Sequence, residues 1–306
     1  MRKLTSTKNL SHDKWLEYRN KGIGGSEAAA IAGMNPWKSP IRVYLEKIGE
    51  VEQPEENERM RIGRDLEDYV AQRFAAGMGM KVRKRNAILQ HDEHDWMLAN
   101  IDREIVGVNE GLECKVTNSY AASDWKYEVP PMYEIQCHHY MAVTGYDRWW
   151  IAALIGNQEI VIRKIERDQE VIDYLIKIES DFWNNHVLKK EMPPPDGSED
   201  AAELIKKRYS QSVDIEIDLD HAYGEKIARI KEIDALATEL NTEKEKLKQE
   251  IQLEMGEAEK AFVGDHKVTW KTVRSNRIDS KLLKKEQPEI AEKYSNESVS
   301  RRFEIK

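Results

Sequence analysis

Apolar and polar residues alternate along the chain on both sides of a short turn at residues 109–111. The alternation covers residues 104–108 less regularly and residues 112–116 without interruption. A period of two is typical of β-strands, and an Asn-Glu-Gly sequence between two such runs predicts a hairpin. Successive side chains of a strand point to opposite faces, so we expect Glu113 and Lys115 to share one face of the sheet.

The same pattern of apolar positions predicts the other regular elements. Short apolar runs predict further strands at residues 82–89, 97–101, 149–155 and 160–165. Apolar residues that recur every three or four positions predict helices at residues 28–32, 59–76, 131–141, 168–190 and 221–255. A second hairpin is expected near the end of the chain, at residues 260–263 and 267–273. The chain therefore mixes strands and helices.

A proline-rich run at residues 192–198 is the clearest boundary in the chain. We predict one domain over residues 1–196 and a C-terminal extension over residues 197–306, made of a long charged helix, a hairpin and a polar tail. The apolar positions of the long helix are separated alternately by three and four residues, as in a coiled coil or a helical hairpin. They are Ile230, Ile233, Ala237, Leu240, Leu247 and Ile251, and Lys244 interrupts them.

Composition narrows the class of protein without naming a function. The chain has 306 residues, 34% of them charged, a formal net charge of −8, and two cysteines. Two cysteines form neither a disulfide framework nor a zinc set, and no apolar run has the length of a membrane span, so we expect a cytoplasmic protein without membrane contact. Because the net charge is negative, DNA binding would depend on local basic patches such as residues 81–85, which an edge strand explains equally well.

Two carboxylates and one ammonium converge at the predicted hairpin. Asp102 ends the first strand opposite Glu113 and Lys115 on the second. Burying such a group is costly unless a divalent cation binds between the carboxylates, which is the arrangement of a metal-dependent nuclease. The alternative interpretation is a solvated hairpin that carries a surface ion pair.

Three further polar residues on predicted helices are candidates for the same group. Glu67 shares a helix face with apolar residues, so it is either paired with an arginine or belongs to the metal site. Gln136 and Tyr140 lie one helical turn apart, which suits core packing and suits equally well the positioning of a water, a phosphate oxygen or a lysine.

Arg19 and Ser26 flank a glycine-rich turn that leads into a helix. Backbone N–H groups at a helix N-terminus, a hydroxyl and a guanidinium together suit a terminal phosphate. The alternative interpretation is a simple capping turn.

These motifs occur together in an order that resembles a known family. The set resembles the lambda-exonuclease-like, or YqaJ-type, viral recombinase nucleases of the PD-(D/E)xK superfamily, over roughly residues 10–190. The motifs lie at residues 15–19, 24–27, 63–67, 101–102, 112–115 and 136–140. The resemblance implies an α/β (α+β) fold, a restriction-endonuclease-like core with a central mixed sheet flanked by helices. Ile101 stands where the superfamily often has proline, and the family's compact lambda enzyme has no counterpart of the section after Gly197.

The resemblance also implies roles for the site residues. Asp102, Glu113 and the backbone carbonyl of Cys114 would bind the metal, with Glu67 as the acidic residue from the helix. Lys115 would orient or deprotonate the attacking water.

For the neighbouring residues, Gln136 would be the motif glutamine, with Tyr140 supporting its helix. Arg19 and Ser26 fall where the lambda enzyme holds the 5′-phosphate of the strand that it degrades.

The implied activity is a Mg²⁺-dependent exonuclease, with Mn²⁺ as a substitute, that digests linear double-stranded DNA processively 5′→3′. It would leave 3′ overhangs for a single-strand annealing recombinase, act as a ring-shaped trimer, and be encoded by a phage or prophage in a bacterial host. The alternatives are another nuclease of the superfamily, either an endonuclease or a RecB-like single-strand exonuclease, and a non-catalytic phage scaffold or adaptor protein.

Overall fold

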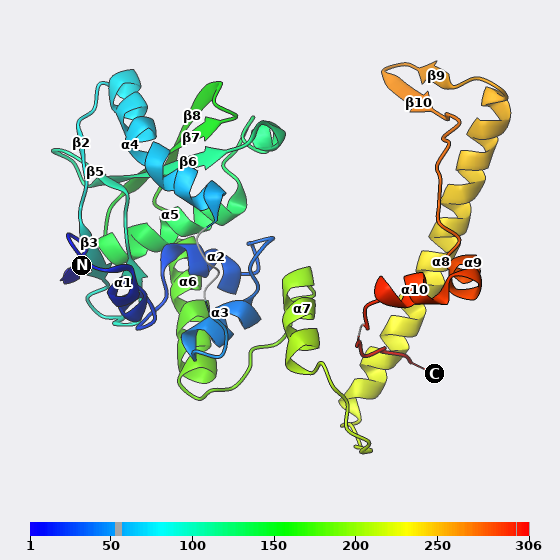
Figure 1. The fold of residues 1–306 in the computed structure, drawn as a ribbon. Helices are drawn as coiled ribbons and strands as arrows, with labels where there is room; N and C mark the ends of the chain where they lie inside the picture. Colours follow the sequence, from blue (N-terminus) through cyan, green and yellow to red (C-terminus); the bar gives the residue numbers. More distant parts are fainter. Residues whose placement is uncertain (53–56, 298, 306) are drawn as a thin grey trace. The chain divides into compact units, whose positions relative to one another are not determined.

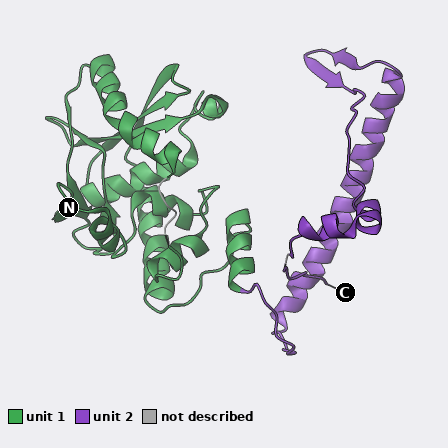
Figure 2. Ribbon diagram, viewed as in Figure 1, with its two compact units in different colours: residues 1–208 green, residues 209–306 purple. Residues whose placement is uncertain are grey.

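The chain forms two compact units, Met1–Arg208 and Tyr209–Lys306, which Figure 2 colours separately. The computed structural model describes residues 1–52, 57–297 and 299–305. Helix α7 (Glu199–Arg208) belongs to the first unit, because it buries Leu204 there and Asp200 accepts hydrogen bonds from Ser39. The predicted boundary at residue 196 therefore falls too early: the proline-rich run connects two helices of one unit.

A five-stranded mixed sheet is the centre of the first unit (Figure 1). Its strands, in spatial order, are β2 (Val82–Arg83), β5 (Arg103–Ile105), β6 (Glu110–Thr117), β7 (Arg148–Ile155) and β8 (Glu159–Glu166). β6 and β7 pair in parallel and the other neighbours are antiparallel. β7 and β8 are joined by residues 156–158. Gly156 and Asn157 in this connection both have positive φ, as tight hairpin turns require.

Helices cover both faces of this sheet (Figure 1). Helix α4 (Glu58–Met78) packs on one face, where Phe74 contacts a core that includes Leu112 and, at its edge, Cys114. Helix α5 (Pro131–Thr144) lies on the other face, in the larger core that contains Trp149. The expected mixed sheet between helices is confirmed.

Two predicted elements are divided in the structure. The strand expected at residues 82–89 is two strands, because Asn86 adopts a positive φ of 46° and turns the chain. β2 stays in the main sheet, and β3 (Ala87–Gln90) enters a three-stranded sheet with β1 (Arg2–Ser6) and β4 (Leu98–Ala99). The helix expected at residues 168–190 is α6 (Gln169–Asp181) followed by a π-helical segment, Phe182–Val187.

The hairpin at the centre of the sequence argument is present, but its turn lies earlier than predicted. β5 stops at Ile105, and Gly107 bends the chain with a φ of 95°. Val106 and Val108 are exposed in that turn, so their apolar character does not mark a strand.

Short helices complete the first unit. They are α1 (His12–Arg19), α2 (Gly25–Ile31), α3 (Pro40–Lys47) and a 3₁₀ turn at Ser119–Ser123. The helix predicted at 131–141 is confirmed as α5 and ends at Gly145, whose φ of 72° is typical of a helix C-terminus.

The second unit consists of the long helix α8 (Ala222–Met255), a hairpin and two short helices. The hairpin is β9 (Lys260–Val263) with β10 (His266–Thr269), followed by α9 (Ser280–Glu286) and α10 (Pro288–Lys293). The predicted long helix and hairpin are confirmed. Among the described residues, no helix combines the length and the apolar character needed to cross a membrane.

Candidate functional site

Asp102 lies at the start of β5, beside β6. Its carboxylate accepts a hydrogen bond of 2.8 Å from the backbone N–H of Cys114, which ties the end of one strand to the middle of the other. Burial, together with the negative charges of Glu113 and Glu67, raises the pKa of Asp102 well above its ordinary range. The carboxylate is therefore held where further negative charge is unfavourable and positive charge is favourable.

Glu113, Lys115 and Gln136 form a closed set of contacts on the α5 side of the sheet. The Lys115 Nζ lies 2.7 Å from Glu113 Oε1 and 3.2 Å from Gln136 Oε1. Gln136 Nε2 in turn donates to Glu113 Oε1 at 2.8 Å. The expectation that the Glu113 and Lys115 side chains share one face of the sheet is confirmed. Helix α5 supplies Gln136, which contacts both side chains.

Two tyrosines of α5 support this set. Gln136 also donates to the Tyr140 hydroxyl at 2.9 Å, and the Lys115 ammonium lies 4.8 Å from the centre of the Tyr133 ring. Glu113 and Asp102 raise the pKa of Lys115 above its ordinary value despite the opposing effect of burial. Lys115 is therefore an ammonium ion that is oriented from three sides.

Glu67 reaches this region from α4, on the opposite face of the sheet. Arg103, almost fully buried, pairs with Glu67 and with Asp68, and donates to the backbone carbonyl of Asp102 at 2.6 Å. The arginine pairing that the sequence left open is thus present. It keeps Glu67 close enough for its charge to raise the pKa of Asp102.

The oxygen atoms of the site are not all satisfied by protein contacts. Glu113 Oε2 is buried and has no hydrogen-bond partner among the described residues, a costly arrangement unless something else contacts it. The described part of the chain gathers no three Asp, Glu, His or Cys side chains into a metal-binding cluster. The available donors are therefore two carboxylates, of Asp102 and Glu113, and the peptide carbonyl of Cys114, all hard oxygen ligands.

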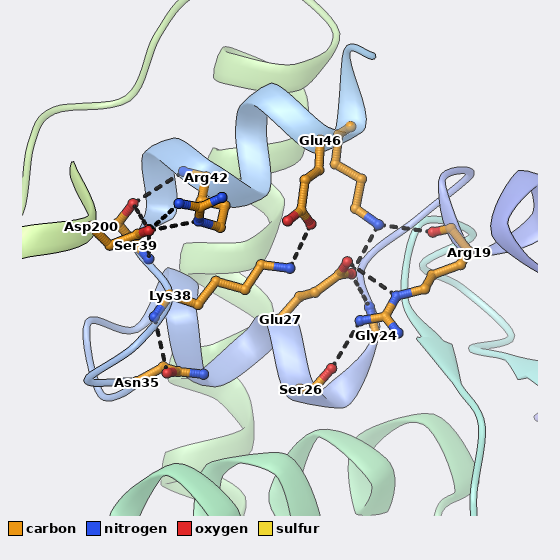
Figure 3. Close-up of polar contacts among 11 residues, drawn as sticks. Arg19, Gly24, Ser26, Glu27, Asn35, Lys38, Ser39, Arg42, Glu46 and Asp200 are labelled. Atoms are coloured by element: carbon orange, nitrogen blue, oxygen red, sulfur yellow. Dashed lines mark hydrogen bonds and ion pairs between the residues drawn. The ribbon is translucent and has the colours of Figure 1, made fainter. Parts of the chain in front are cut away.

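Arg19 and Ser26 lie together at the end of α1 and the start of α2 (Figure 3). The Arg19 Nη2 donates to Ser26 Oγ at 3.0 Å, and its guanidinium lies 5.2 Å from the centre of the Trp15 ring. Arg19 Nε also lies 3.4 Å from a carboxylate oxygen of Glu27. The guanidinium is thus held on several sides while it remains partly exposed.

A buried ion pair behind Arg19 is the main feature that the sequence analysis missed. Glu27 Oε2 lies 2.9 Å from Lys47 Nζ, and both side chains are fully buried. Glu27 also accepts a hydrogen bond of 2.9 Å from the Gly24 N–H (Figure 3). Lys47 also donates to the Arg19 carbonyl at 2.8 Å. Burial alone would raise the pKa of Glu27, but the charges of Lys47, Arg19 and Lys38 outweigh it and hold the pKa below 4.5. In the sequence, Glu27 has only the pattern of an acidic residue in the first turn of a helix, and Lys47 lies in helix α3, which was not predicted.

One cavity connects Arg19 to one of the site carboxylates, that of Asp102. Its volume is about 200 Å³, and its walls include Arg19, Ser26, Asp102 and Tyr140. The glycine turn reaches this place because Ile23 pairs with the β4 region, donating to Trp96 O at 2.6 Å. The tertiary structure therefore brings the two separate sequence motifs to one cavity.

A glycine permits the close packing that shapes the cavity. A Cβ atom on Gly25 would lie 2.6 Å from a Tyr140 ring carbon and 3.1 Å from the Gln136 side chain. Helix α2 can approach α5 this closely because the position has no side chain. The contact joins the Arg19 region to the residues that hold Lys115.

The basic cluster at residues 81–85 is largely committed to internal ion pairs. Arg83 and Arg85 each lie 3.0 Å from the buried carboxylate of Glu104, and Lys84 lies 2.9 Å from Asp68. β2, which contains Arg83, is an edge strand of the main sheet. The cluster therefore helps to close the sheet edge.

Comparison with known proteins gives the family. Residues 14–147 match the model of the YqaJ-like viral recombinase domain. The uncharacterized protein YqaJ of Bacillus subtilis (strain 168) is 42% identical over 308 residues, which cover 99% of this chain and 97% of that protein. The chain belongs to the YqaJ-like viral recombinase family. The matched region contains Arg19, Ser26, the β5–β6 hairpin and all of α5.

Solved structures place this YqaJ-family chain in a fold group. An alkaline exonuclease (LHK-Exo) from Laribacter hongkongensis superposes with a TM-score of 0.50 at 18% identity, covering 64% of this chain and 97% of that one. The same protein in complex with dAMP gives a TM-score of 0.51. The likeness shows the fold: the first unit has the PD-(D/E)xK architecture expected from the sequence.

Proposed function

We propose that the chain is a metal-dependent deoxyribonuclease that digests linear duplex DNA from a 5′-phosphate end. The observation that carries this proposal is the single cavity lined both by Arg19 and Ser26 and by Asp102. A guanidinium beside a hydroxyl suits a terminal phosphate, and the carboxylates suit phosphodiester hydrolysis. A phosphate pocket beside the hydrolytic group favours a nuclease that works from an end.

Mg²⁺, with Mn²⁺ as a substitute, fits the donor set of this site. Asp102, Glu113 and the carbonyl of Cys114 would hold it, and the unpartnered Glu113 Oε2 is the atom whose burial such an ion would compensate. When bound, the ion would supply Lewis-acid activation of the phosphodiester and of its attacking water. Glu67, paired with Arg103, would add negative charge from the opposite face.

Lys115 and Gln136 would act on the water and the phosphate. Lys115 is an ammonium whose direction is set by Glu113 and Gln136, so it would donate a hydrogen bond to the attacking water and place positive charge beside the phosphate. Gln136, which donates a hydrogen bond to the Tyr140 hydroxyl, would keep the Lys115 ammonium in place while the geometry at the phosphorus atom changes during hydrolysis.

The direction and products of the reaction form the finer part of the proposal. Binding of the 5′-phosphate by Arg19 and Ser26 would give 5′→3′ digestion and leave 3′ overhangs for a single-strand annealing recombinase. The similarly folded alkaline exonuclease forms a complex with dAMP, a nucleoside monophosphate, which is the kind of product that stepwise digestion from a DNA end would release.

Digestion of three linear duplexes tests the proposal. They are identical except for a 5′-phosphate, a 5′-hydroxyl or a blocked 5′ end, and a closed circle is the control, each with Mg²⁺ and with EDTA. We expect rapid strand loss from the 5′-phosphate duplex in Mg²⁺ alone. Cutting of the circle would indicate an endonuclease, and no cutting anywhere would support a non-catalytic adaptor.

Substitution of Lys115 tests the site itself. Lys115→Ala should lower the cleavage rate by about 10²-fold or more, because it removes a positive charge aimed at the reacting group. DNA binding and folding should change little. The matched control is Lys164→Ala on β8, a half-exposed lysine that pairs with Glu166. Near-normal cleavage by the Lys115 variant would overturn the assignment of the site.

A further inference from the structure

Lys47 is a buried cation beside the proposed phosphate pocket, and no step of the proposed reaction uses it. Its side chain is fully buried, and its Nζ lies 2.9 Å from Glu27 Oε2. The same ammonium donates a hydrogen bond of 2.8 Å to the backbone carbonyl of Arg19. Burying a lysine is costly unless the charge is paired. Lys47 therefore contacts both Glu27 and the residue that would bind the phosphate.

Glu27 is the residue for which Lys47 and Arg19 compete. Its Oε2 lies 2.9 Å from Lys47 Nζ, whereas its Oε1 lies 3.4 Å from Arg19 Nε (Figure 3). Burial favours the neutral form of Glu27, but the charge of Lys47 opposes burial most strongly, and the pKa of Glu27 lies below 4.5. The nearer and more deeply buried of the two cations is thus the main counter-ion of Glu27.

A third cation in this region, Lys38, is committed to another carboxylate. Lys38 Nζ lies 2.5 Å from Glu46 Oε2, and the Glu46 side chain is almost fully buried (Figure 3). The second oxygen of Glu46 is buried without a hydrogen-bond partner among the described residues. Moving Lys38 toward Glu27 would leave the buried charge of Glu46 uncompensated. Lys38 therefore cannot replace Lys47 without creating a second unpaired carboxylate.

The sum of the charges explains why Arg19 stays available. Two cations, Arg19 and Lys47, surround one anion, Glu27, so the three side chains carry a net charge of +1. Arg19 Nη2 donates to Ser26 Oγ at 3.0 Å, and 24% of the arginine side chain is exposed. Without Lys47 the net charge would be zero, and Arg19 would become the main counter-ion of Glu27. A guanidinium already neutralised by a carboxylate attracts a phosphate less strongly.

We propose that Lys47 is a positioning residue for recognition of a 5′-phosphate. By neutralising Glu27, it leaves the charge of Arg19 available to the phosphate. Lys47 is fully buried, so it acts through Arg19 and not by contact with DNA. The inference rests on the proposed binding of a 5′-phosphate by Arg19 and Ser26, but it does not require that the chain cleave DNA.

Binding of two DNA hairpins that differ only at their open end tests this inference. One carries a 5′-phosphate and the other a 5′-hydroxyl, and each has fluorescein in its loop. Dissociation constants for the full chain are measured by fluorescence anisotropy in EDTA, so that metal-dependent cleavage does not interfere. We expect the wild type to bind the phosphorylated hairpin about tenfold more tightly or better, and Lys47→Met to lose most of that preference.

The ratio of the two dissociation constants separates positioning from stability. Both hairpins are measured with the same protein preparation, so a smaller folded fraction weakens both apparent affinities equally and leaves the ratio unchanged. Lys47→Gln provides a second variant if Lys47→Met does not fold. It removes the same charge but keeps an N–H donor for the Arg19 carbonyl, and it should lose the same preference.

Two further variants identify the charge as the cause. Arg42→Met is the matched control: Arg42 lies on the same helix and pairs with Asp200, so its loss should lower stability and leave the preference for phosphate intact. The double variant Glu27→Gln with Lys47→Met has neither the buried carboxylate nor its counter-ion. Arg19 then keeps its charge, so the double variant should regain the preference that Lys47→Met loses.

The inference is overturned if Lys47→Met and Lys47→Gln keep the wild-type preference, if Arg42→Met loses it equally, or if the double variant does not regain it. Equal binding of the two hairpins by the wild type would also overturn it, because Lys47 would then have no phosphate preference to support. A chain that prefers the phosphorylated hairpin but cuts no duplex in Mg²⁺ would refute the proposed nuclease and leave this inference standing.

Discussion

The buried ion pair between Glu27 and Lys47 leads to a sharp prediction about stability. Lys47→Met removes the ammonium 2.9 Å from a fully buried carboxylate and keeps a side chain of similar length. Removing one partner of a buried pair costs about 3–5 kcal/mol because the other charge remains without compensation. Glu27 keeps the Gly24 N–H at 2.9 Å and Arg19 at 3.4 Å, so we expect the lower end of that range, about 3 kcal/mol.

The measurement is urea unfolding followed by tryptophan fluorescence. All tryptophans except Trp270 lie in the first unit, so the signal reports mainly on the unit that contains the pair. The control is the double variant Glu27→Gln with Lys47→Met, which has no buried charge at the pair and keeps an acceptor for Gly24. We expect the double variant to be more stable than Lys47→Met alone. The reasoning is refuted if Lys47→Met unfolds within 1 kcal/mol of the wild type, or if the double variant is the less stable of the two.

The pH dependence gives an independent measure of the same pair. The pKa of Glu27 in the folded chain lies below its ordinary value of 4.5, so its contribution to stability is fully present above pH 4.5. It is lost as the pH falls from 4.5 toward the lower folded pKa. The stability difference between the wild type and the Glu27→Gln variant should therefore shrink as the pH falls below 4.5, which unfolding curves at several pH values would measure.

Three further predictions concern packing and a second buried pair. Gly25→Ala should destabilise the first unit by about 1–3 kcal/mol and lower cleavage, because its Cβ would lie 2.6 Å from a Tyr140 ring carbon; urea unfolding and the duplex assay measure both effects. Gly63→Ala should instead stabilise the unit by about 0.5–1 kcal/mol, since nothing lies within 4 Å of an added Cβ in that helix; a lower midpoint in urea would contradict this. His139 lies 2.9 Å from Glu179; burial opposes its charge, but Glu179 outweighs burial and raises the pKa of His139 above 6.5. The pair's contribution is therefore fully present below pH 6.5 and lost at higher pH, so Glu179→Gln should cost more stability at pH 6 than at pH 9.

The sequence by itself determined the elements whose signal is local. The alternation over residues 112–116 put Glu113 and Lys115 on one face of β6, because successive side chains of a strand point to opposite sides. The helical spacing of Gln136 and Tyr140 put both on one face of α5. These features depend on backbone periodicity, which neighbouring residues specify without reference to the rest of the chain.

Only the tertiary structure decided what depends on distant contacts. The division of residues 82–89 into strands of two sheets follows from the turn at Asn86 and from pairing with β1 and β5, which the apolar run does not reveal. Likewise, α7 belongs to the first unit because Asp200 contacts Ser39, far earlier in the chain. The proline-rich run marked a connection, but its composition carried no information about which helices would pack together.

The candidate site shows the same division. Arg19 and Asp102 were each predicted as parts of a functional group, but their shared cavity exists because the turn at Ile23 pairs with the β4 region. The sequence did not predict the Glu27–Lys47 ion pair, because each residue, taken alone, has the pattern of a charged residue exposed to solvent. Whether a charge is buried depends on the whole folded chain. Here the buried Glu27 carboxylate is compensated by the ammonium of Lys47, which another helix places at hydrogen-bonding distance. The local sequence around either residue does not predict that contact.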